Sequence, residues 1–350
     1  QGGVGKTLGN LGIAHRALGQ YGEAIEFYQQ ALELYKSLND NASLRRVLGN
    51  LGNVYAIIGR YGEALKNQQE SLRIARELDD LEGEQRSLAN LGGIYAEQGD
   101  YAQAIENYET SLALARDLGN REAEAKVLAN LGSAYNAQGQ DFERAIANYQ
   151  QVYQIAQDIG AQWLEAEALA QQGFANERLS EFEVALEFYD RSVALFREGE
   201  FPQSVSMSLN NRAHAQLTWI STVGQDVATR DQLLEGATND LTEAISLLDA
   251  LRGNLNADID RVSLFDTQVM TYNLLQQVRV ARGQNEEALV VSELGRSRPF
   301  ATLIGERQEF NQSSFSLEEL QAIANKQNAT IVEYSLIPED SVIHQGKSGG

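Results

Sequence analysis

The sequence contains no cysteine, and this absence excludes disulfide bonds, thiolate metal sites and a cysteine nucleophile within the chain. A chain without cysteine suits a reducing compartment, so we expect a cytoplasmic location. Only three prolines occur in 350 residues, which permits long uninterrupted helices. No apolar run approaches the roughly 20 residues that a membrane-spanning helix needs, and the first residues do not resemble a secretory signal peptide.

Basic residues are also scarce. The chain has 28 Lys and Arg against 49 Asp and Glu, which gives a net charge of −21. Such a charge argues against nucleic acid or an anionic membrane as the main partner, because both repel an acidic surface. The acidity names no partner by itself, but it keeps an extended binding surface in solution.

A repeated motif dominates what is present. The tripeptide Asn-Leu-Gly begins at Asn10, Asn50, Asn90 and Asn130. The step is 40 residues each time. A repeat of this length is typical of a solenoid built from one supersecondary unit.

One copy of the repeat predicts two antiparallel helices. Leu88, Leu91 and Tyr95 lie on one helical face, and Gly99 follows as a stop signal. A second helical stripe follows at positions 104, 105, 108, 112 and 115. The small residue Gly92 allows the two helices to approach closely. Each unit is therefore a helix A, a tight turn and a helix B, and stacked units share one continuous core.

The predicted fold is an all-α solenoid of about seven helix hairpins over residues 1–305. The repeats span about 1–40, 41–80, 81–120, 121–160, 161–200, 203–252 and 257–304. The fourth carries one extra residue in its turn, at 139–142. In the sixth we expect a long turn from Thr222 to Gln232, with helix B from Thr238 to Leu251.

The motif resembles the tetratricopeptide repeat (TPR), in which Leu-Gly-x-x-Tyr in helix A is followed by Ala and an aromatic residue in helix B. The 40-residue length is similar to the long repeats of kinesin light chains and spindle-orientation adaptor proteins, although the proline usual at the repeat's end is absent. The resemblance implies a right-handed superhelix whose A helices line a concave, protein-binding or peptide-binding groove.

Two rows of polar residues occupy the helix A face that this groove would use. The asparagine row is Asn10, Asn50, Asn90 and Asn130, and Asn211 occupies the corresponding position of the sixth repeat. The basic row lies one helical turn earlier and consists of Lys6, Arg46, Arg86 and Lys126. A carboxamide can pair with both the C=O and the N–H of a peptide bond, so the first row would hold main chain. The second row would favour an acidic peptide. Further candidates are Asn53, Asn136 and Glu177.

A purely structural role for these residues is the alternative. The asparagines would then bond to the neighbouring repeat, and the bases would pair with Glu84, Glu122 or Glu124. Tyrosines on the Leu-Gly stripe are expected in the core rather than on a ligand platform: Tyr55, Tyr95 and Tyr135.

No arrangement of residues predicts catalysis, a metal or a cofactor. The segment Gln1–Thr7 resembles the end of a phosphate-binding loop, but it lacks the first glycine and the preceding strand and aligns with the first turns of a helix A. His15 and His214 have no second ligand at metal spacing, and we find no paired carboxylates. We therefore expect this chain not to be an enzyme.

The pattern changes near the C-terminus. Residues 306–316 form a polar linker, followed by a capping box at Ser316–Glu319 and a predicted strand at Ala329–Leu336. Together with the segment Glu287–Arg298, this resembles the junction at which TPR arrays enter a CHAT domain, a caspase-like domain found mostly in bacteria. The resemblance implies that 317–350 is the start of a truncated CHAT-like domain, without its active residues.

Three functions remain open. The chain is a peptide-binding or protein-binding scaffold that serves as the sensor or regulatory arm of a CHAT-type protein, or the non-catalytic part of a caspase-like cysteine peptidase. Alternatively it is a scaffold that forms homo-oligomers through the apolar face of its first repeat, around Leu8 and Leu11.

Overall fold

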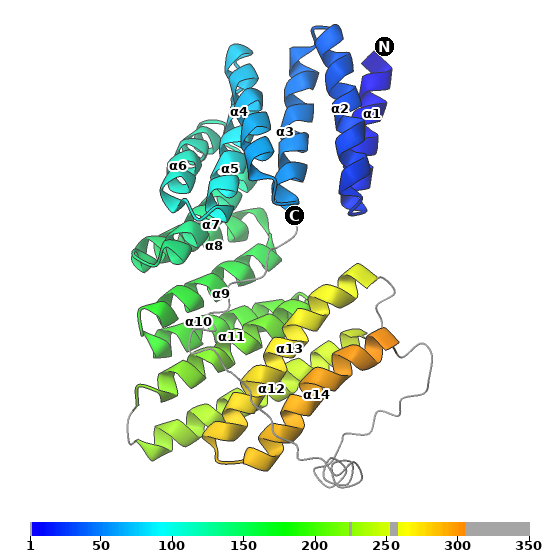
Figure 1. Cartoon of the computed structure of the whole chain (residues 1–350). Coiled ribbons are helices and arrows are strands. Elements are labelled where there is room, and N and C mark those ends of the chain that lie inside the picture. The colour runs from blue at the N-terminus through cyan, green and yellow to red at the C-terminus, as the bar shows by residue number, and fades with distance from the viewer. Residues whose placement is uncertain (1, 224–225, 253–257, 305–350) are drawn as a thin grey trace. The chain divides into compact units, whose positions relative to one another are not determined.

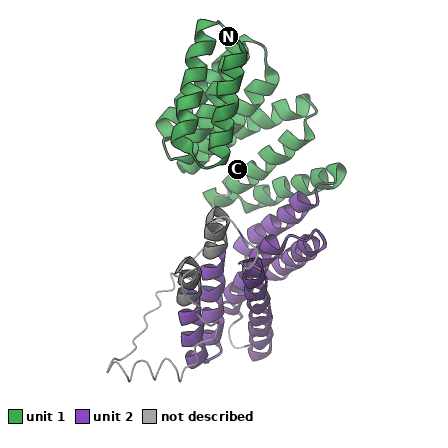
Figure 2. Cartoon of the chain, turned by 90° about the vertical axis from the view of Figure 1, so that its right-hand side faces the viewer, with its two compact units in different colours: residues 1–160, 349–350 green, residues 161–348 purple. Residues whose placement is uncertain are grey.

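The computed structural model describes residues 2–223, 226–252 and 258–304, apart from the side chains of 252, 258–266 and 296–304. These residues form 14 α-helices and no strand (Figure 1). The predicted linker and CHAT-like segment, 306–350, lie outside the described residues. The helices divide into two compact units, residues 1–160 and 161–348, coloured green and purple in Figure 2.

Unit 1 consists of four helix hairpins. Its A helices are α1 (Gly2–Ala17), α3 (Asn41–Ile57), α5 (Leu81–Glu97) and α7 (Arg121–Gln138), and its B helices are α2 (Tyr21–Ser37), α4 (Tyr61–Glu77), α6 (Tyr101–Asp117) and α8 (Phe142–Ile159). Each helix packs on the next one along the chain. The 40-residue step of the sequence is thus a step of one hairpin, as predicted.

Unit 2 contains three further hairpins. Its A helices are α9 (Gln162–Arg178), α11 (Pro202–Ile220) and α13 (Asp258–Ala281), and its B helices are α10 (Phe182–Glu198), α12 (Val227–Arg252) and α14 (Asn285–Ile304). Here too the A helices contact one another, α9 with α11 and α11 with α13. The prediction of about seven hairpins is confirmed.

Local signals set the helix boundaries. Asp80 caps α5 by accepting a hydrogen bond from the Gly83 backbone N–H at 2.8 Å, and Asn120 caps α7 in the same way through Ala123 at 3.0 Å. At the A-to-B turn, Gly99 adopts a φ of 78°, which a residue with a side chain rarely tolerates. The predicted helix stop at Gly99 is confirmed. The repeats lack the usual proline at their ends, and here capping residues such as Asp80 and Asn120 mark the start of the next helix A.

Close contact between a glycine of helix A and a tyrosine of helix B forms the core of most hairpins. A Cβ on Gly92 would lie 2.7 Å from the Tyr108 ring, and one on Gly132 would lie 2.7 Å from Tyr149. The same contact joins Gly173 and Tyr189 in unit 2. The stripe tyrosines also pack inward as predicted: Tyr55 and Tyr135 are buried and Tyr95 is half-buried.

Two local predictions can be compared with the structure. The phosphate-loop-like segment Gly2–Thr7 is helical and forms the start of α1, as the repeat register predicted. The expected long turn in the sixth hairpin is wrong, because α12 begins at Val227 rather than near Thr238. Asp226 explains the earlier start: its carboxylate accepts hydrogen bonds from the Thr229 backbone N–H at 3.2 Å and the Thr229 hydroxyl at 2.7 Å, which caps the helix.

None of the helices in the described ranges is long and apolar enough to cross a membrane.

Candidate functional site

The A helices of unit 1 form one continuous layer. In addition to their own B helices, α1 contacts α3, α3 contacts α5, and α5 contacts α7. The four helices begin in the same register of the repeat, so residues 40 positions apart occupy equivalent places along the layer. We call the solvent-facing side of this layer, which bears the asparagine and basic rows, the ladder face.

The predicted rows lie at the surface and side by side on each helix. The four basic residues are exposed; Asn10 and Asn130 are exposed, and Asn50 and Asn90 are half-buried. Each base precedes its asparagine by four residues, which places the two on one side of the helix. Each base therefore lies one turn from its asparagine on the same side of its helix.

The four asparagine side chains make no hydrogen bond to any residue that the structure describes. Other asparagines of unit 1 do: Asn107 donates to the Gln103 carbonyl at 2.8 Å, and Asn148 donates to the Arg144 carbonyl at 2.8 Å. The structural alternative, in which the asparagine row bonds to the neighbouring repeat, is not what the geometry shows. The amides of the ladder face keep both donor and acceptor available.

The basic row is also weakly engaged. Arg86 lies 3.7 Å from the Glu82 carboxylate, and both side chains are more than half exposed. Arg46 donates to the Ser43 hydroxyl at 3.5 Å, and its charge contributes to lowering the pKa of Asp40. Lys6 and Lys126 form no ion pair within the described part of the chain. Exposed pairs of this kind contribute about 0–1 kcal/mol, so a ligand displaces them at little cost.

Two of the three acids that the structural alternative assigned to the basic row pair elsewhere. Glu84 binds the Arg76 guanidinium at 2.7 Å, and Glu124 binds Arg116 at 2.9 Å and Arg121 at 2.7 Å. The interpretation of Glu84 and Glu124 as partners of the row is therefore wrong. These pairs join a B helix to the following A helix, Arg76 to Glu84 and Arg116 to Glu124, and they recur at the 40-residue step.

Arg45 is a buried cation next to the ladder face that the sequence patterns did not reveal. Its guanidinium Nε lies 2.9 Å from Asp80 Oδ2. Burial lowers the pKa of Arg45; Asp80 opposes this shift, while Arg86 and Arg46 add to it by repulsion. Arg45 therefore lies near both arginines of the basic row, while its own charge is paired with that of Asp80. The equivalent positions of the other repeats hold the uncharged residues Gly5, Gln85 and Ala125. A charged residue at this position of one repeat was the sequence signal that could have identified Arg45.

The additional candidates have different outcomes. Asn53 lies on the ladder face, three residues after Asn50, and its Oδ1 accepts a hydrogen bond from the Gln68 Nε2 at 2.7 Å. Asn136 follows Asn130 by six residues, which rotates it about 240° around the helix and away from that face. Its Oδ1 is buried without a hydrogen-bond partner in the described structure. Asn136 therefore does not join the rows.

Glu177, the candidate in unit 2, is buried rather than open to a groove. Its Oε1 lies 2.7 Å from His214 Nδ1, and its Oε2 accepts a hydrogen bond from the Tyr189 hydroxyl at 3.3 Å. Burial and the adjacent Glu177 carboxylate raise the pKa of Tyr189. His15, in unit 1, packs its ring on Phe27 at 5.0 Å. No group of three potential metal-ligating side chains occurs in the ranges that the structure describes.

The rows change character at the equivalent positions of unit 2. On α9 the base is replaced by Glu167 and the asparagine by Gln171, whose Nε2 donates to the Glu167 carboxylate at 2.8 Å. On α11 the base is replaced by Met207, and Asn211 is half-buried. The ladder face is therefore a property of unit 1.

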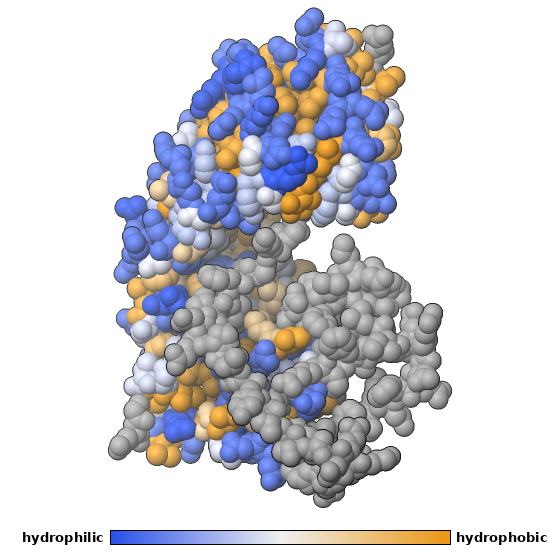
Figure 3. All heavy atoms as spheres, in the orientation of Figure 1, coloured by the Kyte–Doolittle hydropathy of each residue, from blue (hydrophilic) through white to orange (hydrophobic). Residues whose placement is uncertain are grey.

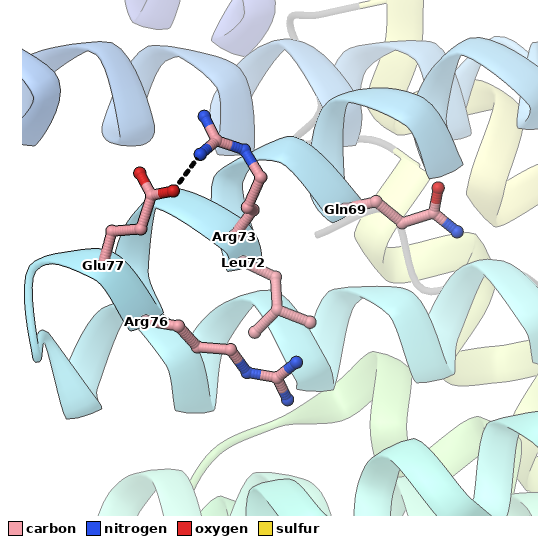
Figure 4. A pocket seen from close by; sticks show the side chains of 5 residues that line it. All are labelled: Gln69, Leu72, Arg73, Arg76 and Glu77. Atoms are coloured by element: carbon pink, nitrogen blue, oxygen red, sulfur yellow. Dashed lines mark hydrogen bonds and ion pairs between the residues drawn. The ribbon is translucent and has the colours of Figure 1, made fainter.

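Two hollows on the surface of unit 1 contain no residue of the asparagine or basic row. Figure 4 shows one of about 510 Å³, lined by Gln69, Leu72, Arg73, Arg76 and Glu77, all from α4. Its arginines are already paired, Arg73 with Glu70 and Glu77, and Arg76 with Glu84. Hydrophilic and hydrophobic residues alternate over the visible surface of unit 1 in Figure 3. The candidate site is thus an extended face rather than a pocket.

Comparison with known proteins decides the family. The model of the tetratricopeptide repeat matches residues 3–77, 84–158 and 130–198. The chain belongs to the tetratricopeptide repeat family. Tetratricopeptide repeat protein 28 of mouse and of human are each 37% identical to it over 109 residues, which is 29% of this chain and 4% of the relative. The TPR chain thus matches only a small part of these relatives' length.

Solved structures share the fold at low sequence identity. A signal transduction ATPase (STAND protein) with a tetratricopeptide repeat sensor from Pyrococcus horikoshii has a TM-score of 0.64 and 16% identity, covering 85% of this chain and 43% of that protein. The apo form of RapI has a TM-score of 0.58 and 13% identity, covering 86% and 99%. A Rap protein complexed with Competence and Sporulation Factor has a TM-score of 0.50 and 16% identity, covering 78% and 74%.

Proposed function

We propose that this TPR chain is a scaffold that binds a peptide or a segment of a partner protein along the ladder face of unit 1. The observation that carries the proposal is the row of four asparagines in one register whose side chains make no hydrogen bond within the described structure. Carboxamides that are not committed to hydrogen bonds inside the fold suit recognition of a backbone that offers N–H and C=O groups alternately.

The spacing of the layer fits an extended ligand. Packed helices lie roughly 10 Å apart, and an extended chain advances about 3.3 Å per residue. One asparagine per hairpin then contacts about every third residue, so that four hairpins hold a stretch of about nine residues. Because amides bind the main chain, this contact gives affinity without choosing the ligand's side chains.

The positive charge of the basic row favours an acidic ligand. The basic row lies one helical turn from the asparagines, and Arg46 and Arg86 can each bind a carboxylate through two hydrogen bonds. Arg45 lies beside them, but its guanidinium is paired with the Asp80 carboxylate at 2.9 Å, so this pair adds no net charge to the face. An acidic ligand would displace the weak Arg86–Glu82 pair and gain two stronger ones.

We further propose that the chain is the sensor or regulatory arm of a larger CHAT-type protein. The junction motif in residues 287–336 supports this, and so does the likeness to an ATPase that carries a TPR sensor. In that arrangement, ligand binding at unit 1 controls a domain that follows the array. The caspase-like peptidase reading differs only in giving that domain a catalytic cysteine, which this chain lacks.

The charge contribution is tested by a matched pair of double variants. A random library of peptides of about nine residues is selected on the wild-type chain, and the enriched peptides are titrated calorimetrically. Arg46→Ala/Arg86→Ala should weaken binding about tenfold to a hundredfold, because two charge-assisted contacts are lost. The control, Arg73→Ala/Arg76→Ala, removes the same charge from α4 and should leave affinity within about twofold. Equal affinity of both double variants would contradict the proposal.

A second candidate function, self-association through α1, is favoured by one observation. Leu11 is 37% exposed, whereas its equivalents Leu51, Leu91 and Leu131 are 3%, 4% and 2% exposed. Those equivalents are covered by a preceding B helix, so a second copy that covers Leu11 would bury the same kind of surface. Light scattering should then show a dimer that Leu11→Glu converts to monomer; a monomer at high concentration in the wild-type chain would exclude it.

A further inference from the structure

The second hairpin departs from the packing rule of the other hairpins of unit 1. Where they place a tyrosine against the helix A glycine, this hairpin places Gln68, which is fully buried. A Cβ on Gly52 would lie 2.9 Å from the Gln68 Nε2, so the amide occupies the position of the tyrosine ring. A buried carboxamide in place of an aromatic residue costs stability unless its polar atoms are hydrogen-bonded.

The hydrogen bonds of the Gln68 side chain allow only one orientation of its amide group. Its Nε2 donates to the Gly49 carbonyl at 2.8 Å, and a carbonyl can only accept. The Nε2 must therefore face this side, and its second hydrogen goes to Asn53 Oδ1 at 2.7 Å. Gln68 Oε1 is left buried without a partner among the described residues. The Asn53 amide is consequently fixed with its oxygen inward and its Nδ2 hydrogens toward the ladder face.

Asn53 belongs to a third row, one turn beyond the asparagines. The equivalent positions in the other hairpins of unit 1 are Ile13, Gly93 and Ser133. Ile13 is 44% exposed, Gly93 has no side chain, and the Ser133 hydroxyl lies 3.0 Å from the Tyr149 hydroxyl. Unlike the asparagine and basic rows, this third row differs at every repeat, as expected of positions that contact side chains of a ligand.

Side chains of an extended peptide alternate between two sides. With the main chain over Asn50, one ligand side chain points toward Arg46 and the next toward Asn53. We propose that Asn53 selects a ligand side chain that accepts hydrogen bonds, a carboxylate or carboxamide, and that Gln68 is the positioning residue that leaves Asn53 only its two donors. This rests on the proposed function, and it adds a side-chain preference that the ladder itself does not supply.

Peptide selection on matched variants tests the assignment. Asn53→Asp keeps the oxygen that accepts from Gln68 and replaces the two outward hydrogens by an acceptor. Wild-type chain should enrich Asp, Glu, Asn or Gln at one peptide position, and N53D should enrich Lys, Arg or Ser there while the other positions keep their preferences. An unchanged preference in N53D would overturn the assignment.

Three variants isolate the role of Gln68. Gln68→Phe removes the donor and should abolish the preference at that one position, with about a tenfold loss of affinity. Gln68→Tyr should retain it, because a tyrosine hydroxyl at this place can donate and lies within reach of the third row, as the Tyr149 hydroxyl lies 3.0 Å from the Ser133 hydroxyl. The control Tyr108→Phe removes a hydroxyl beside Gly93 and should change nothing. Retention of the preference in Q68F, with thermal unfolding unchanged, would show that Gln68 does not act through its donor.

Failure of the parent proposal gives a different result. If wild-type chain and a chain lacking Asn50, Asn90 and Asn130 enrich the same peptides, the ladder face is not the binding surface, and the role of Asn53 falls with it. If the chain lacking Asn50, Asn90 and Asn130 enriches no peptides, while N53D enriches the same sequences as wild type, the ladder face remains the binding surface. The side-chain assignment alone is then overturned.

Discussion

Units 1 and 2 are built from the same hairpin but carry different residues on the solvent-facing side of their A helices. In unit 1, the asparagine row makes no hydrogen bond among the described residues and the basic row is weakly paired. In unit 2, the equivalent positions of α9 carry Gln171 and Glu167, which bond to each other. The comparison teaches that the repeat fixes where a side chain lies, whereas the residue type decides whether that place is available to a ligand.

Unit 2 places its polar groups inside. Arg212 of α11 donates through Nε to Asp240 of α12 at 2.8 Å and also pairs with Asp190 of α10. Asn210 donates to the Thr271 hydroxyl of α13 at 2.9 Å. These bonds cross between helices, so we expect them to fix the packing of unit 2 rather than to bind a partner.

The largest expected loss of stability comes from a substitution that breaks this internal network. Arg212→Ala leaves the buried Asp240 carboxylate without its cation, which should destabilise unit 2 by about 3–5 kcal/mol. Both tryptophans, Trp163 and Trp219, lie in unit 2, so urea unfolding followed by tryptophan fluorescence reports on this unit. Arg46→Ala, on the ladder face, should change the same transition by less than about 0.5 kcal/mol. Similar costs for the two variants would contradict the contrast between the units.

A smaller effect tests what the units share. Gly92→Ala in unit 1 and Gly173→Ala in unit 2 each force a methyl group into a tyrosine ring, and each should cost about 1–3 kcal/mol. The adjacent Gly93 has ordinary space, 3.5 Å from the Tyr108 hydroxyl, so Gly93→Ala should instead stabilise α5 by about 0.5–1 kcal/mol. Circular dichroism during thermal unfolding measures all three. A stabilising Gly92→Ala would show that the glycine is not required by the tyrosine.

The smallest effect concerns the ion pairs that join hairpins in unit 1. Burial alone would raise the pKa of Glu124, but hydrogen bonds from Arg116 and Arg121 outweigh it and lower the pKa. The folded chain therefore binds this proton less readily than the unfolded chain, so the stabilisation is present at neutral pH and is lost as the pH falls through the folded pKa. Glu124→Gln should cost about 1–2 kcal/mol at pH 7.

The pH dependence supplies the control for Glu124. The difference in unfolding free energy between wild-type chain and E124Q should shrink as acid protonates the carboxylate, below about pH 4. A difference that stays constant from neutral to acid pH would mean that packing, and not charge, accounts for the cost.

Much of the architecture was predictable because the repeat makes it redundant. Four copies of Asn-Leu-Gly fix the helix register, and Gly99-like turns fix its ends, so an error in one copy is corrected by the others. The ladder rows followed from the same redundancy. The start of α12 was mispredicted because that hairpin occurs once, and its signal, Asp226 followed by Thr229, depends on a local cap rather than on the period.

Side chains that depart from the repeat were the least predictable. Arg45 and Gln68 occupy core positions that most other copies fill with small or aromatic residues, and their partners Asp80 and Asn53 lie outside their own helices. Periodicity marks such positions as exceptions but does not show where their polar atoms point. The burial of Glu177 was missed for the same reason, because His214 and Tyr189 come from two different helices.

The most direct test of the account is calorimetric titration of library-selected acidic peptides into Asn50→Ala/Asn90→Ala/Asn130→Ala. Three lost main-chain contacts should weaken binding about a hundredfold without changing the unfolding transition. The control Asn107→Ala/Asn148→Ala removes carboxamides from B helices and should bind as the wild-type chain does. Affinity of the triple variant within about threefold of wild type would contradict the claim that the ladder face holds the ligand.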